Sequence, residues 1–339
     1  MNSSTEKRAN RLAIPVVLMG LGSIGRSIAR AALAKPELEI VAAVDLDPSR
    51  TGKTLAEVLG VAAPDLIVGG DASAALKKAP GGVLLHATYS RLAQVEGELA
   101  QACSAGLSVA STCEELAYPW LSNPEIAERL DRIAQKRKVA LLGTGVNPGF
   151  IFDRLVATLA HVVGPIDRIR CLRVVDSRTR RVQLQRKSGA GLSEEEFADG
   201  DEDGTIGHVG LKESAALAAL GAGLEIDHVD EEIDPVETDD DQAGAGGIFV
   251  PKGGIVGLRH VARAIREERV VVELELIIAL GAPDPRDEIE IFANPGLRLI
   301  IPGGVQGDDA TSWAIVHAAP LLPGAEPGLI TVLDLPSGR

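Results

Sequence analysis

The sequence feature that most constrains the fold is a set of three glycines near the start of the chain. Gly20, Gly22 and Gly25 form a G-x-G-x-x-G pattern that directly follows the apolar run Ile14–Met19 and opens a stretch with helical periodicity. In that context the pattern predicts a tight turn between a buried strand and a helix, whose N-terminus can receive an anionic group. Asp45 follows Gly25 by twenty residues, at the end of the next apolar run. The spacing is typical of a dinucleotide site, here made of Gly20, Gly22, Ser23, Ile24, Gly25 and Asp45. The alternative is a glycine-rich turn without a ligand.

Two residues bear on which dinucleotide binds. The carboxylate of Asp45 can accept hydrogen bonds from the adenine ribose hydroxyls and would repel a 2′-phosphate, which favours NAD. Arg50 lies just beyond it and could hold a 2′-phosphate together with Ser49, or it could be a solvated side chain of the next helix. We therefore expect NAD, with NADP also accepted.

The first 150 residues alternate short apolar runs with helical stretches. The expected strands are Ile14–Met19, Glu39–Val44, Leu66–Val68, Gly82–His86, Ser108–Ser111 and Val139–Leu142. The expected helices are Ser23–Ala34, Thr51–Leu59, Ala72–Lys78, Leu92–Ala105 and Pro124–Lys136. Because the strands lack strict polar alternation and helices separate them, the pattern indicates an α/β fold with a Rossmann-type, doubly wound parallel sheet.

After residue 150 the pattern changes to longer, more alternating strands. We expect them at Ile166–Val175, Gln183–Gln185, Glu225–Ile233, Arg269–Ile278 and Glu288–Phe292, with surface loops at Glu194–Gly204 and Asp239–Gly247. This predicts a second, α+β domain over 151–303 with a mixed or antiparallel sheet and few helices. A helix is expected over Asp309–Leu322, and residues 304–339 are expected to return to the first domain, 1–150. A chain of 339 residues is long enough for two cores.

Composition narrows the class of protein. With 48 acidic and 34 basic residues the formal net charge is −14, which disfavours nucleic acid and anionic membranes as partners. The chain has no uninterrupted apolar run long enough to span a bilayer. Its three cysteines are too few and odd in number for a disulfide framework, so we expect a cytoplasmic protein. The six histidines show no ligand spacing, and we expect no metal site.

Polar residues follow three of the expected strands, where a doubly wound sheet forms its ligand crevice. Thr88 follows the fourth strand, and Asn147-Pro148 follows the sixth and could form a wall of the nicotinamide site or merely begin a helix. Glu114 and Glu115 follow the fifth. A carboxylate there can act as a general base, and two adjacent ones point in different directions. One would face the site and the other would cap a helix or pair with a cation, unless both are first-turn helix acids.

Aromatic residues are rare in this chain, and five of the nine fall within a fifth of its length. They are Tyr89, Tyr118, Trp120, Phe150 and Phe152. We expect Tyr89, Tyr118, Phe150 and Phe152 to line a small, dry substrate pocket, and core packing is the alternative. The basic segment Arg168–Lys187 could capture a carboxylate or phosphate, but pairing with acids across a sheet or a subunit interface is the more common arrangement.

Several segments together resemble one enzyme family. They are Ser-Thr-Cys-Glu-Glu-Leu at 111–116, Gly-Thr-Gly-Val-Asn-Pro-Gly-Phe at 143–150, Lys-Ser-Gly-Ala-Gly-Leu at 187–192, Gly-His-Val-Gly-Leu-Lys-Glu-Ser at 207–214, Gly-Asp-Asp-Ala-Thr at 307–311 and the tail at 327–336. The chain resembles the 2,4-diaminopentanoate dehydrogenases and the amine dehydrogenases related to them, with a fold similar to dihydrodipicolinate reductase. The His pair typical of those reductases is missing here, which argues against their diacid reaction.

The resemblance implies an NAD(P)-dependent oxidoreductase acting on CH–NH2 groups. Such an enzyme aminates a small ketone or aldehyde with ammonia and, in reverse, deaminates an amine that needs no α-carboxylate. It also implies a homodimer and a catalytic glutamate, which we assign to Glu115 with Glu114 as the second candidate. The alternatives are 2,4-diaminopentanoate dehydrogenase proper and a non-catalytic NAD-binding sensor or scaffold, in which the crevice carboxylate would serve no purpose.

Overall fold

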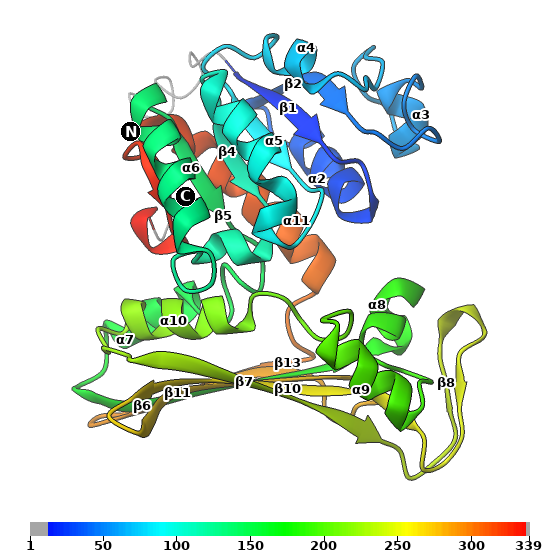
Figure 1. Ribbon diagram of the computed structural model, residues 1–339, viewed down its shortest axis with the longest axis vertical. Coiled ribbons are helices and arrows are strands. Elements are labelled where there is room, and N and C mark those ends of the chain that lie inside the picture. Colours follow the sequence, from blue (N-terminus) through cyan, green and yellow to red (C-terminus); the bar gives the residue numbers. More distant parts are fainter. Residues whose placement is uncertain (1–12, 337–339) are drawn as a thin grey trace, which may run out of the picture. The chain divides into compact units, whose positions relative to one another are not determined.

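The computed structural model describes residues 13–336, apart from the side chain of Thr179. These residues form two compact units (Figure 1). Unit 1 consists of residues up to 150 together with those from 307 onward, and unit 2 consists of 151–306. The sequence analysis placed the return three residues earlier, at 304.

Unit 1 is built on a six-stranded parallel sheet in the order β14-β5-β4-β3-β1-β2. The strands are β1 (Ile14–Met19), β2 (Leu38–Val44), β3 (Val83–His86), β4 (Ser108–Ser111), β5 (Ala140–Gly143) and β14 (Gly328–Ile330). The helices are α2 (Ser23–Leu33), α3 (Leu55–Leu59), α4 (Ala72–Leu76), α5 (Leu92–Ser104), α6 (Pro124–Arg137) and α11 (Gly307–Ala318). The doubly wound fold expected from the sequence is confirmed.

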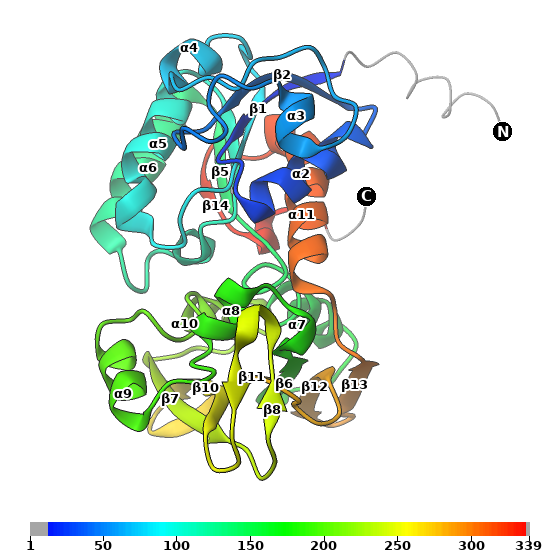
Figure 2. The same cartoon turned by 90° about the vertical axis from the view of Figure 1, so that its right-hand side faces the viewer.

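Both faces of this sheet are covered. Val16 and Leu18 of β1 pack in one apolar cluster with α2, α3 and α11, whereas Val17 and Met19 pack in another with α4, α5 and α6. Figure 2 shows α2 and α11 side by side on their face of the sheet. Because successive side chains are buried on opposite faces, the strands read as continuous apolar runs.

Unit 2 is built on a mixed six-stranded sheet in the order β13-β12-β6-β11-β10-β7. A mixed or antiparallel sheet was expected from the sequence. Its strands are β6 (Ile166–Asp176), β7 (His228–Glu237), β10 (Ile255–Arg266), β11 (Arg269–Ala279), β12 (Arg286–Ala293) and β13 (Leu297–Pro302), with a small hairpin of β8 (Gln242–Ala243) and β9 (Phe249–Val250). Its helices are α7 (Arg154–Ala160), α8 (Val182–Lys187), α9 (Glu194–Glu202) and α10 (Leu211–Gly221). The long helix α10 packs against β10, β11 and α7.

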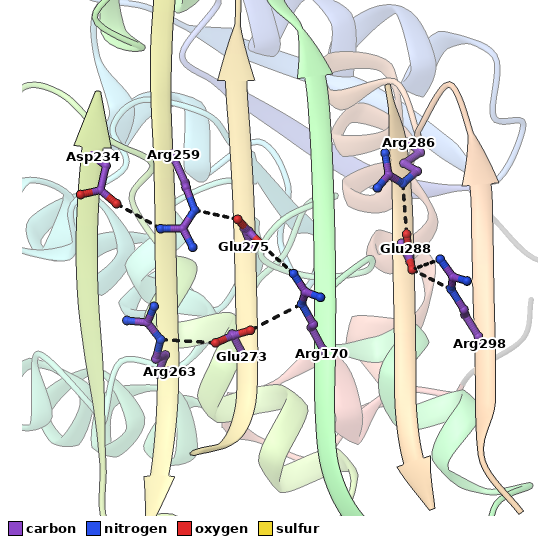
Figure 3. A network of polar contacts seen from close by, with 9 residues as sticks. All are labelled: Arg170, Asp234, Arg259, Arg263, Glu273, Glu275, Arg286, Glu288 and Arg298. Carbon is purple, nitrogen blue, oxygen red and sulfur yellow. Dashed lines mark hydrogen bonds and ion pairs between the residues drawn. The ribbon is translucent and has the colours of Figure 1, made fainter. Parts of the chain in front are cut away.

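One face of the second sheet carries a lattice of ion pairs (Figure 3). Arg170 of β6 contacts both Glu273 and Glu275 of β11, and Arg259 of β10 joins Glu275 to Asp234 of β7. The lattice continues with Arg263–Glu273, Arg286–Glu288 and Arg298–Glu288. Two arginines of the basic segment singled out in the sequence, Arg170 and Arg173, therefore pair with acids across the sheet.

Three local expectations were wrong. Leu66–Val68 makes only isolated bridges and backbone hydrogen bonds at the edge beside β2, and it is not a strand of the sheet. Gln183–Gln185 lies inside the helix α8. The acidic segment from Glu194 is the helix α9, because Ser193 and Glu196 form a reciprocal cap at its start and three acids occupy its first turn.

Candidate functional site

The carboxyl ends of four strands of unit 1 lie in one row. Met19, His86, Ser111 and Gly143 are register partners across β1, β3, β4 and β5. The ladder continues one step further, since the N–H groups of the residues after β3, β4 and β5 donate to the last carbonyls of their neighbours, at 2.8 to 3.0 Å. The glycine turn, Thr88, the glutamate pair and the segment 144–150 therefore all leave from one edge of the sheet.

The glycine turn has the form that a dinucleotide requires. Gly20 has a φ of +82°, and a Cβ built there would lie 2.4 Å from the carbonyl oxygen of Ala87. A Cβ on Gly25 would lie 1.8 Å from the carbonyl oxygen of Gly20, so helix α2 can approach the turn only without a side chain. Gly22, which precedes Ser23 and Ile24 at the start of α2, meets nothing within 4 Å. The structure thus leaves open the space where a pyrophosphate would approach the helix N-terminus.

Asp45 and Arg50, assigned to opposite cofactor preferences, form one ion pair. The Oδ2 of Asp45 accepts hydrogen bonds from the Leu21 N–H at 2.6 Å and from Arg50 Nε at 2.9 Å. Its Oδ1 accepts from the Asp47 N–H at 2.8 Å and from Arg50 Nη2 at 3.2 Å. Burial acts to raise the pKa of Asp45, but the bonds from Arg50, Asp47 and Leu21 outweigh it and hold that pKa below its ordinary value. A ribose hydroxyl could donate a hydrogen bond to this carboxylate only if it replaced one of these donors.

The two adjacent glutamates point to different surroundings, at the start of a 3-10 turn (Glu114–Ala117) that follows β4. The Oε2 of Glu115 accepts hydrogen bonds from the Leu92 N–H at 2.7 Å and from Asn123 Nδ2 at 3.2 Å, and its Oε1 lies 3.5 Å from Arg91. Glu115 thus caps the start of α5 and pairs with a cation. The side chain of Glu114 is half-buried, and its Oε2 is shielded from solvent.

The third strand end is a closely packed turn. A Cβ on Gly143 would collide with the backbone of Leu116 and Ala117 at 2.5 to 2.8 Å, so this glycine lets the glutamate turn pack on β5. Asn147 is buried and is joined to Pro148 by a cis peptide bond. The N–H of Val146 donates to the hydroxyl of Thr311 of α11 at 3.1 Å. Asn147 and Pro148 therefore stand on the same edge as the glycine turn.

The aromatic residues fall into two groups. Tyr89, Trp120 and Phe150 are exposed in unit 1, with 58%, 39% and 41% of their surfaces accessible, and Tyr118 packs edge-on against Trp120 with ring centroids 5.3 Å apart. Phe152 belongs to unit 2 and is fully buried. Apart from Phe152, these aromatic residues thus follow strands of unit 1 at the sheet edge that carries the glutamates, where they could line a substrate pocket.

The described residues give little support for a metal site, a nucleophilic cysteine or a membrane span. Within residues 13–336, no three His, Cys, Asp or Glu side chains converge in a way that could hold a metal ion. Cys103, Cys113 and Cys171 are free and buried, and burial raises the pKa of each thiol, which makes them poor nucleophiles. None of the helices in the same part of the chain combines the length and apolar character needed to cross a bilayer.

Sequence reasoning gave no role to His86, although it lies in the row of strand ends. The imidazole is fully buried and contacts Ser111, Glu98 and Thr88. The available signal was a histidine that ends an otherwise apolar strand. The spacing of the histidines excluded a metal site but did not bear on this position.

A glycine turn at a helix start, an acid after the next strand and polar groups at the ends of parallel strands define an oxidoreductase that uses a nicotinamide dinucleotide. Residues 150–339, more than half of the chain, match the family of the 2,4-diaminopentanoate dehydrogenase C-terminal domain, and the chain belongs to this family. The resemblance noted in the sequence is confirmed.

Two curated relatives span the whole chain. The 2,4-diaminopentanoate dehydrogenase of Acetoanaerobium sticklandii is 29% identical over 96% of this chain and 94% of its own length. An amine dehydrogenase of Streptomyces virginiae is 25% identical over 95% of this chain and 96% of its own.

Two solved structures show the fold. An amine dehydrogenase from Mycobacterium smegmatis superposes with a TM-score of 0.85 at 24% identity, covering 97% of this chain and 98% of that one. A dihydrodipicolinate reductase from Paenisporosarcina sp. TG-14 gives a TM-score of 0.52 at 12% identity, covering 95% and 99%. The expected likeness to the reductase fold is confirmed.

Proposed function

We propose that the protein is an NAD(P)-dependent amine dehydrogenase, which aminates a small ketone or aldehyde with ammonia and deaminates the corresponding amine. Membership of the family and the two full-length relatives support this reaction class. The glycine turn, with its open space at Gly22, supports a bound nicotinamide dinucleotide. NAD is our first choice because Asp45 follows β2, and NADP is also accepted if Arg50 turns from Asp45 to a 2′-phosphate.

We assign the proton transfers to Glu114, although the sequence analysis favoured Glu115. One observation carries this choice: the carboxylate of Glu115 is already committed to the Leu92 N–H, Asn123 and Arg91. Glu114 is its neighbour on the same turn, which follows β4 at the sheet edge that also carries the glycine turn. Glu115 then holds the turn against α5, and Glu114 is the catalytic residue.

The mechanism follows from what a carboxylate at this position can do. A substrate ammonium must lose a proton before the carbon bearing it can release a hydride, and Glu114 accepts that proton. A bound oxidised nicotinamide would supply the hydride acceptor for this reaction. Glu114 passes that proton to solvent, so its carboxylate can stabilise the resulting substrate iminium and then accept a proton from the water that adds to the iminium carbon. Glu114 returns this second proton to the nitrogen of the carbinolamine. The carbinolamine expels ammonia and leaves the carbonyl product, and the reverse sequence forms the amine.

The remaining site residues have supporting roles in this proposal. Thr88, Asn147 and Pro148 border the cofactor at the strand ends, and Tyr89, Tyr118 and Phe150 line the apolar side of the substrate pocket. Phe152 is fully buried in unit 2, which favours core packing for this residue.

The second candidate is 2,4-diaminopentanoate dehydrogenase itself, which the name of the family and the relative from A. sticklandii favour. Its substrate carboxylate would need a cation. Three of the eight basic residues of the basic segment are already engaged, because Arg170, Arg173 and Arg178 pair with Glu273, Asp287 and Asp176. For this reason we place the simple amine reaction first.

A screen tests the two reactions together. Small ketones and aldehydes would be incubated with ammonium and NADH or NADPH, and 2,4-diaminopentanoate with NAD⁺, while the absorbance of the reduced nicotinamide is followed. Oxidation of the cofactor by a simple carbonyl supports the first proposal. Turnover of 2,4-diaminopentanoate alone supports the second, and bound cofactor without turnover of any of these compounds indicates a sensor or scaffold.

A pair of matched variants tests the glutamate assignment. Glu114→Gln should lower kcat by about 10²- to 10⁴-fold while NADH still binds, because the proton acceptor is lost. Glu115→Gln should retain far more activity, since an amide oxygen can still accept the bond from the Leu92 N–H. The opposite ranking would return the catalytic role to Glu115.

We further propose that the enzyme is a cytoplasmic homodimer. The family resemblance supports the dimer, and the three buried, free cysteines suit a reducing compartment. Light scattering of the purified protein should give twice the chain mass of 35.4 kDa, and the mass of a single chain would contradict the dimer.

A further inference from the structure

A buried chain of hydrogen bonds runs beneath the proposed active site. The Nδ1 of His86, at the end of β3, lies 2.8 Å from the hydroxyl of Ser111 at the end of β4. Its Nε2 lies 2.8 Å from Oε2 of Glu98 on α5 and 2.9 Å from the hydroxyl of Thr88. His86 and Ser111 are both fully buried, so water cannot replace these partners.

The Glu98 end of the chain fixes its direction, because an ionised carboxylate can only accept. The Ser111 hydroxyl oxygen accepts a hydrogen bond from the Cys113 N–H at 3.0 Å, and a backbone N–H can only donate. At the other end Glu98 accepts from the Thr88 hydroxyl at 2.8 Å. Burial acts to raise the pKa of Glu98, but the bonds from His86 and Thr88 outweigh it and hold that pKa below its ordinary value, so the carboxylate is ionised and only accepts.

These constraints assign the tautomer of the ring. The Nε2 of His86 carries the hydrogen and donates it to Glu98, and Nδ1 accepts from the Ser111 hydroxyl. With this tautomer every donor in the chain meets an acceptor. A fully satisfied network of this kind holds its members in one arrangement.

Each end of the network holds an element of the active site. Cys113, which Ser111 fixes, immediately precedes Glu114 and also donates its Sγ–H to the carbonyl of Ser90. Thr88, which Glu98 fixes, turns its methyl group toward the glycine turn: a Cβ on Gly20 would lie 3.0 Å from that methyl. One chain of bonds therefore connects the glutamate turn to the cofactor turn.

We propose that His86 is a positioning residue for the reaction, which it serves by holding the Glu114 turn through Ser111 and the Gly20 turn through Glu98 and Thr88. This inference rests on the proposed function, because it presumes that Glu114 and the cofactor react together. Its physical basis is that a reacting group displaced by about 1 Å can lose roughly 100-fold in rate.

The first test removes one oxygen atom from the network and compares it with a matched control. Ser111→Ala leaves the Cys113 N–H and His86 Nδ1 without their shared partner, and kcat should fall by about 10- to 100-fold while the Kd of NADH stays close to that of the wild type. Ser108, at the other end of β4, is also buried and accepts the Ala140 N–H at 3.2 Å. Ser108→Ala should lose stability in the same way and keep its kcat.

The second test uses Glu98, the partly accessible end of the network, where a substitution should disturb folding less. Glu98→Ala removes the acceptor of the ring and should lower kcat, whereas Glu98→Gln, whose amide oxygen can still accept from Nε2–H, should recover most of it. Nitrogen NMR of the wild-type imidazole should show the Nε2–H tautomer. The Nδ1–H tautomer would overturn the assigned direction of the chain.

The outcomes separate this inference from the proposed function. An inactive wild-type enzyme in the substrate screen would overturn the proposed function. An active wild-type enzyme whose Ser111→Ala and Glu98→Ala variants keep its kcat would overturn the positioning role alone. Equal losses of kcat in Ser111→Ala and Ser108→Ala would do the same, because the effect would then reflect general stability.

Discussion

The two units rest on sheets of equal strand number that use polar residues in opposite ways. In unit 1 both faces of the sheet are buried, and the polar groups gather where the strands end, at Met19, His86, Ser111 and Gly143. In unit 2 the polar groups lie along the strands, as a lattice of arginines and carboxylates on one face. A sheet covered on both sides offers chemistry only at its ends, whereas a sheet with an uncovered face can use its length for charge pairing. We therefore expect changes in unit 1 to alter cofactor binding and turnover, and changes in unit 2 to alter stability.

The largest expected effect concerns a deeply buried ion pair of the second sheet. Arg173 and Asp287 lie 3.0 Å apart, and both are almost inaccessible. They also bind the backbone of Val305, whose carbonyl accepts from Arg173 and whose N–H donates to Asp287. Arg173→Ala should lower the free energy of unfolding by about 3–5 kcal/mol, because it leaves a buried carboxylate without its cation. Urea unfolding measures it, and Arg263→Ala on the half-exposed lattice should cost no more than about 1 kcal/mol.

The next largest expected effect concerns Gly22, where a substitution should weaken NADH binding without changing the stability of the protein. Gly22→Ala places a methyl group in the open space before α2, at an ordinary negative φ, so the apoprotein should fold as the wild type does. NADH should bind about 10- to 100-fold more weakly, which corresponds to roughly 1–3 kcal/mol. Fluorescence titration and thermal unfolding measure the two quantities. Gly25→Ala, where the methyl would meet the Gly20 carbonyl, should instead lose stability, and similar behaviour of the two variants would break the comparison.

A smaller effect concerns the choice of cofactor. Arg50→Ala frees the carboxylate of Asp45 from its ion pair and removes the cation available to a 2′-phosphate. The ratio of kcat/KM for NADPH to that for NADH should fall by about tenfold, the loss of one charged hydrogen bond. An unchanged ratio would show that Arg50 does not contact the 2′ position.

The smallest expected effect concerns the pH dependence of the stability that Glu275 of the ion-pair lattice contributes. Burial acts to raise the pKa of Glu275, but Arg259 and Arg170 outweigh it, so that pKa is lower in the folded protein than in the unfolded chain. Its contribution to stability is therefore present above the unfolded value of about 4.3 and is lost as the pH falls through the folded value. Glu275→Gln should cost about 1 kcal/mol at neutral pH, and this difference should shrink in acid. A difference in urea midpoint that is independent of pH would contradict the assignment.

The comparison also explains what the sequence could predict. The strands of unit 1 are apolar throughout and are separated by helices, so β1 and β4 were placed with their exact bounds. Strand β12 alternates between buried and accessible residues, and the sequence predicted its central part. Strand β13 and the long β10 were missed, and arginines interrupt the apolar residues of both. The helix α9 was hidden by its acids, which suit a helix start and also suit a loop.

The candidate site also has features that the sequence could predict and features that it could not. Which residues would lie at the sheet edge followed from strand order, since carboxyl ends of parallel strands meet there. The sequence could also say that one of two adjacent glutamates would cap a helix. It could not say which, because that depends on the position of Leu92 and Arg91, more than twenty residues away in the chain. The His86 network was hidden for the same reason, since Glu98 approaches the ring only through the packing of α5.

Unit 1 is discontinuous, and this sets an order of events during synthesis. Its outermost strand β14 and the helix α11 come from the last part of the chain, and Ile315, Val316 and Ile330 complete one of its two apolar clusters. A ribosome has by then released every strand of unit 2. Until residues 307–330 emerge, the nascent chain therefore holds all strands of unit 2 while β5 of unit 1 remains an open edge, exposed to any chain that could pair with it.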